Sequence, residues 1–135
     1  MLRSILSVVA GYAVWTLIYL GGNATLGVFM PDAFQSGTVS DPTVLILMLA
    51  SSCLASLAAG YTTALVAGAR PMLHAGWLVA SLLATGIPVQ ISAWDDLPPW
   101  FHLTFLILLI PIPLAGAKLV KPRVQRTYAV DEGDF

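Results

Sequence analysis

The polar side chains inside the long apolar runs of this sequence are few. Several of them lie where one run ends or the next begins, on the same predicted side of the molecule. A histidine near two carboxylates could exchange protons, while amide and hydroxyl groups could line a polar vestibule open to water. The same residue types also join neighbouring membrane helices by hydrogen bonds, and that interpretation is the simpler one. The candidate polar vestibule comprises Asn23, Gln90, Asp95, Asp96, His102 and Thr104.

Three aromatic residues, Tyr12, Trp15 and Tyr19, follow one another at helical spacing in the first apolar run. Residues three and four apart lie on one face of a helix, so these rings form a single stripe. Such a stripe could stack against a flat lipid-soluble molecule or fill a groove on a partner protein. Packing inside a helix bundle is the commoner use of aromatic residues at this spacing.

Catalytic and metal-binding constellations are not recognisable in the sequence. His74 lies at the inner end of the third predicted helix and His102 at the outer end of the fourth, so the two cannot share a metal, and Cys53 is the single cysteine. A metal site needs several such ligands close together. We therefore expect no catalytic residues, no bound metal and no cofactor, and we expect the protein not to be an enzyme and not to bind nucleic acid.

The elements that position these residues are apolar helices. Hydrophobic residues make up 58% of the 135 and charged residues only 10%, which is far from the composition of an ordinary soluble domain. A helix that crosses a bilayer needs about 20 apolar residues. The sequence predicts an all-α integral membrane protein, a four-helix transmembrane bundle of two antiparallel hairpins. The expected spans are residues 5–29, 43–67, 72–93 and 100–120, with Asp41-Pro42 as a helix start and Pro98-Pro99 as a turn.

The positive charges are confined to one side of this topology. Lysine and arginine favour the cytoplasmic side of a membrane, so both termini should be cytoplasmic. The last residues, 121–135, form a charged cytoplasmic tail after the membrane domain of residues 1–120. The cations near the tail should bind anionic lipid headgroups. The cations on this side are Arg3, Arg70, Lys118, Lys121, Arg123 and Arg126, of which the last four are the lipid-headgroup candidates.

Small residues predict how the helices pack, because close approach of backbones holds membrane helices together. Ser52, Ser56 and Gly60 recur every four residues in the second span, and Gly76, Ala80 and Ala84 do so in the third. We expect these stripes to make the second and third helices central. Pro88, Pro111 and Pro113 should kink their helices.

In composition the chain resembles small multi-pass proteins of the bacterial inner membrane, and we expect that location. The leading hypothesis is a protein without enzymatic activity that serves as an accessory or structural subunit of a larger membrane assembly, or as a homo-oligomer. Its expected partners are membrane lipid and other membrane subunits or copies of itself. A small transporter or channel using the polar outer vestibule, and a binding module for a lipid-soluble cofactor, are the alternatives.

Overall fold

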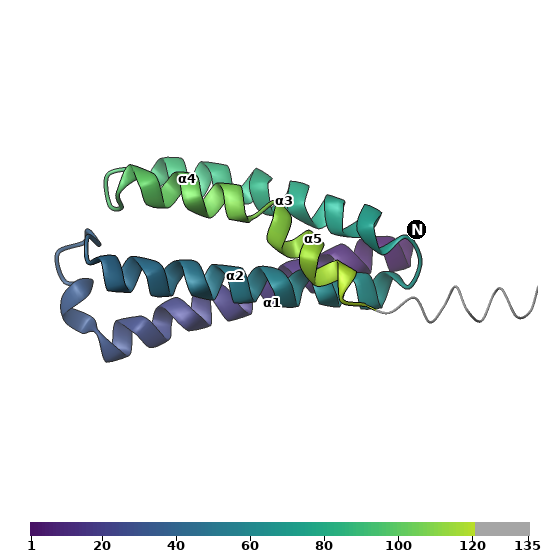
Figure 1. The fold of residues 1–135 in the computed structure, drawn as a ribbon, viewed down its shortest axis with the longest axis horizontal. Helices are drawn as coiled ribbons and strands as arrows, with labels where there is room; N and C mark the ends of the chain where they lie inside the picture. The colour runs from purple at the N-terminus through teal and green to yellow at the C-terminus, as the bar shows by residue number, and fades with distance from the viewer. Residues whose placement is uncertain (121–135) are drawn as a thin grey trace, which may run out of the picture.

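The computed structural model describes residues 1–120, which form a helical bundle (Figure 1). Four segments are long and apolar enough to cross a membrane: α1, α2, α3, and α4 together with α5. The prediction of an all-α chain with four helices of spanning length is therefore confirmed for these residues. The predicted tail, with Lys121, Arg123 and Arg126, lies outside the described residues. The elements are α1 (Leu2–Phe29), the short 3-10 helix η1 (Pro31–Ala33), α2 (Pro42–Ala67), α3 (Pro71–Ser92), α4 (Pro99–Leu108) and α5 (Pro111–Lys118).

Prolines mark the helix starts. The helices α2, α3, α4 and α5 each have proline at their first position, where its missing N–H costs nothing and its fixed φ suits the helix. At α2 the Asp41 carboxylate accepts a hydrogen bond of 2.9 Å from the Thr43 N–H. This is the N-cap predicted from the sequence.

The fourth span is broken rather than kinked. Helix α4 ends at Leu108, and α5 begins at Pro111 after a two-residue turn. Pro111 cannot donate to the Ile107 carbonyl, which instead accepts from the Ile110 N–H at 3.3 Å. As a result α5 leaves the direction of α4 and crosses toward α2 (Figure 1). Pro88, by contrast, lies inside α3, which continues without a break to Ser92.

Helix α2 is the central helix, with α1, α3, α4 and α5 all packed against it. Its contact with α5 is backbone on backbone. A Cβ atom placed on Gly60 would overlap the Pro113 carbonyl, and one on Gly116 would overlap the Leu57 carbonyl. Ser52, Ser56 and Gly60, the small residues of α2 singled out from the sequence, are all buried.

The small-residue stripe of α3 was expected to pack against the other helices, but it faces away from them. Gly76, Ala80 and Ala84 are exposed, and a Cβ on Gly76 would meet no atom within 4 Å. The helix instead buries larger residues, and Leu78 and Leu82 belong to the same core cluster as Phe101 and Phe105 of α4. The expectation that this stripe packs the bundle and makes α3 central is therefore corrected. The buried residues of α3 are Ala75, Leu78, Val79, Leu82 and Gln90.

The two ends of the bundle differ in charge. At one end the Arg3 Nε donates 2.7 Å to the Val66 carbonyl, which places the start of α1 beside the α2–α3 turn that carries Arg70. We call this the basic end. At the other end the Val39 N–H donates 2.9 Å to the Asp96 carbonyl and joins the α1–α2 and α3–α4 loops. We call this the acidic end, because those loops carry Asp32, Asp41, Asp95 and Asp96.

Candidate functional site

The predicted polar vestibule is divided in the structure. Gln90 on α3 and His102 on α4 do come together, and both side chains are buried. Asp95 and Asp96 remain in the exposed turn between the two helices. The Thr104 hydroxyl donates 2.7 Å to the Trp100 carbonyl of its own helix. Gln90, Asp95, Asp96 and Thr104 thus share the acidic end with His102, but only Gln90 is hydrogen-bonded to it.

His102 forms the centre of a compact cluster. Its Nδ1 is hydrogen-bonded to the Gln90 side-chain oxygen, and its Nε2 lies 3.3 Å from the Trp94 carbonyl oxygen. The imidazole also stacks on the Trp94 ring, with centroids 4.8 Å apart and planes at 14°. Since His102 has no exposed surface, the arrangement joins α3 to α4 and shields the ring from surrounding solvent.

Asn23, the remaining vestibule candidate, lies away from this cluster. It sits on α1, four residues after Tyr19 and so on the same side of that helix. Its Oδ1 is buried without a hydrogen-bond partner, although buried polar atoms are usually paired. The structure therefore associates Asn23 with the aromatic stripe of α1 rather than with His102.

That aromatic stripe faces the other helices. The Tyr12 hydroxyl lies 2.9 Å from the Thr85 hydroxyl on α3, and the Trp15 indole N–H donates 3.0 Å to the Ser56 hydroxyl on α2. The Trp15 and Tyr19 rings stack with centroids 4.8 Å apart. Phe105 of α4 approaches both of these rings. The stripe thus makes contacts with three helices of its own chain.

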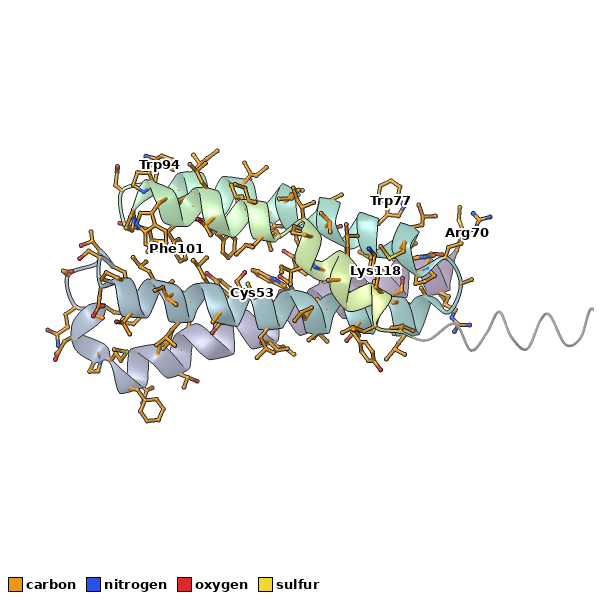
Figure 2. The ribbon with its side chains drawn as sticks, viewed as in Figure 1. Cys53, Arg70, Trp77, Trp94, Phe101 and Lys118 are labelled. Carbon is orange, nitrogen blue, oxygen red and sulfur yellow. The ribbon has the colours of Figure 1, made fainter. Side chains whose placement is uncertain are left out.

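A groove that the sequence did not predict runs between α1 and α3 from the basic end. Its cavity volume is about 810 Å³, and it is lined by Arg3, Ser4, Arg70, His74 and Trp77 among others. Figure 2 shows Arg70 and Trp77 in the half of the bundle that also holds the chain's N-terminus. The clustering of cations on one side of the predicted topology indicates the basic end of this groove. The walls could not be predicted, because they come from α1 and α3, which are not consecutive helices.

Lys118 is the one lipid-headgroup candidate among the described residues. It is exposed at the last position of α5, and Figure 2 places it in the same half of the bundle as Arg70. Within residues 1–120 no three His, Cys, Asp or Glu side chains lie close enough to hold a metal ion.

The described residues therefore define a class: an all-helical protein with four helical segments long and apolar enough to cross a membrane. A scan of family models, a search of curated proteins and a search of solved structures each find no match to this chain.

Proposed function

We propose that this protein has no enzymatic activity and acts as a subunit of a membrane assembly, formed with other membrane proteins or with copies of itself. The observation that carries the proposal is the use made of the polar side chains inside the spans. Three side-chain hydrogen bonds each join two different helices: Tyr12–Thr85, Trp15–Ser56 and Gln90–His102. Side chains engaged in this way stabilise one arrangement of the helices, which is what a structural subunit requires.

The outer face of α3 supports association with a further helix. Gly76, Ala80 and Ala84 are exposed on it at four-residue spacing. Small residues at this spacing allow the backbones of two membrane helices to approach closely, and that approach drives helix association in lipid. Residues 1–120 leave this face uncovered.

The proposed orientation places the basic end in the cytoplasm of a bacterial inner membrane, with both termini inside and the helices paired as two antiparallel hairpins. Arg3 and Arg70 at one end and the four aspartates in the opposite loops support it, because cations favour the cytoplasmic side. The candidate lipid contacts of the tail, Lys118, Lys121, Arg123 and Arg126, would then face the inner leaflet.

Gentle detergent extraction followed by native mass measurement tests the assembly. We expect a complex heavier than the single chain, and a lone monomer at cellular expression levels would contradict the proposal. Replacing the α3 face by Gly76→Leu, Ala80→Leu and Ala84→Leu together should release the chain from that complex. Gly21→Leu with Ala24→Leu, which enlarges an exposed part of α1, is the matched control and should leave the complex intact.

A further inference from the structure

The groove between α1 and α3 has the size of a ligand site. Its cavity volume of about 810 Å³ lies within the roughly 300–1,000 Å³ of small-molecule pockets. A smaller hollow of about 250 Å³ continues it toward Tyr12 and Ala13, and Val8, Val9 and Ser81 line both. The Tyr12–Thr85 hydrogen bond joins α1 to α3 near this far part.

The mouth of the groove is cationic. Arg3 and Arg70 both line it, and the hydrogen bond from Arg3 Nε to the Val66 carbonyl holds one guanidinium in place. The aspartates of the described chain lie in the loops of the acidic end, so they do not neutralise this pair. The positive charge at the mouth is available to an anion.

His74 and Ser4 supply further polar groups beside these cations. His74 Nε2 lies 3.0 Å from the Ser4 hydroxyl, and His74 Nδ1 lies 2.9 Å from the Arg70 carbonyl oxygen. Arg70 itself has a left-handed backbone with φ of 48°, which non-glycine residues adopt at a cost. The contact with His74 helps to hold this turn. Arginine, histidine and hydroxyl side chains are the groups that bind phosphate oxygens.

Beyond the mouth the walls are apolar. Ile5, Val9, Leu73 and Trp77 line the groove and are all exposed. From Arg3 to Tyr12 a helix rises about 14 Å at 1.5 Å per residue, which is about half of the ~30 Å hydrocarbon thickness. The groove therefore extends from the membrane surface through roughly one leaflet, with the charge at the surface and the apolar walls in the interior.

We propose that this groove binds one anionic phospholipid from the leaflet at the basic end. Its phosphate lies between Arg3 and Arg70, in the turn that His74 helps to hold, and the upper part of an acyl chain lies against Val9 and Trp77. Basic pockets between membrane helices bind anionic headgroups through this combination of charge and apolar surface. On α3 the groove wall adjoins the Gly76, Ala80 and Ala84 face, because Leu73 and Trp77 lie three or four residues from those positions. The phosphate contacts Arg3 and Arg70 do not belong to that face, so the charge variants test the lipid site independently of the proposed assembly.

Lipid retention by the purified full-length chain tests the site. Native mass measurement in detergent, titrated with phosphatidylglycerol or with phosphatidylcholine, should show one phosphatidylglycerol bound more tightly than the neutral lipid. Arg70→Gln should weaken that binding about fivefold, the effect of one cation near a membrane surface. Lys118→Gln removes the same charge from the same half of the bundle without touching the groove and should change the binding less than twofold.

A second pair of variants tests the apolar part without altering charge. Ser81→Leu fills the groove and should lower phosphatidylglycerol binding, whereas Ser92→Leu should not. Each serine hydroxyl donates to the carbonyl four residues earlier in α3, at 2.9 Å in both cases, so the two substitutions disturb the helix alike. Equal losses in Arg70→Gln and Lys118→Gln, equal affinity for the two lipids, or displacement of the lipid by inorganic phosphate would each overturn the site.

Discussion

The His102 imidazole is hydrogen-bonded through Nδ1 to the side-chain oxygen of Gln90, which ties α4 to α3 beneath the turn at the acidic end. Both side chains are buried. A buried polar atom that loses its partner keeps the full cost of its desolvation, so each member of this pair depends on the other.

Replacing either member alone should destabilise the bundle. We expect Gln90→Leu or His102→Leu to lower the free energy of unfolding by about 1–3 kcal/mol, because the remaining polar group is left unpaired. The double replacement should cost less than the sum of the two. Unfolding of the purified protein by titration from mild detergent into sodium dodecyl sulfate measures all three. Thr104→Val, which removes a hydroxyl bonded to its own helix, is the control, and additive effects of the two single replacements would contradict the coupling.

The α2–α5 contact should be intolerant of a single methyl group. A Cβ at Gly60 would overlap the Pro113 carbonyl, so Gly60→Ala should separate the two helices and cost about 1–3 kcal/mol. Gly76→Ala is the matched substitution on an open face, where alanine should stabilise the helix by up to about 1 kcal/mol. Thermal unfolding in one detergent compares them, and equal melting temperatures would refute the close approach.

The Trp15 indole N–H depends on Ser56. The indole N–H can only donate a hydrogen bond. Ser56→Ala should therefore leave it unpaired and lower the free energy of unfolding by about 0.5–2 kcal/mol. In a Trp15→Phe background the same Ser56→Ala change should cost measurably less. Unfolding followed by circular dichroism gives the four values of this cycle. If Ser56→Ala costs the same in both backgrounds, the hydrogen bond does not contribute.

The proposed orientation can be measured with single cysteines in a Cys53→Ser background. Gln35→Cys lies in the loop of the acidic end and Ala69→Cys in the turn of the basic end. A membrane-impermeant maleimide added to intact cells should label Gln35→Cys and spare Ala69→Cys until the membrane is opened. The reverse pattern would place the basic end outside.

Sequence patterns predicted the helices well because each apolar run is long and all but the first begin at or next to a proline. They also placed Gln90 and His102 together, since the Pro98-Pro99 turn brings the two helix ends near each other. The face of α3 was predicted wrongly, because a run of small residues does not specify which neighbour fills it. Gly76, Ala80 and Ala84 face outward, while Ala75, Leu78 and Leu82 of the same helix are buried.

The α1–α3 groove could not have been predicted from residue patterns. Arg3 and Arg70 are 67 positions apart in the sequence, and their proximity depends on how the start of α1 packs beside the α2–α3 turn. The break before Pro111 was predicted only as a kink. The change of direction between α4 and α5 is larger than a kink because Gly60 and Gly116 allow α5 to pack directly against the backbone of α2.

The hydrogen bond from the Val39 N–H to the Asp96 carbonyl has a consequence for local opening of the chain. Val39 belongs to a loop, yet its side chain is only 8% exposed and its amide is held by a segment beyond α3. Releasing that amide requires the α1–α2 loop to part from the α3–α4 turn. Because amide exchange in a segment reports the least costly opening that exposes it, the Val39 amide should exchange more slowly than its loop neighbours, and its rate would report how often those two loops separate.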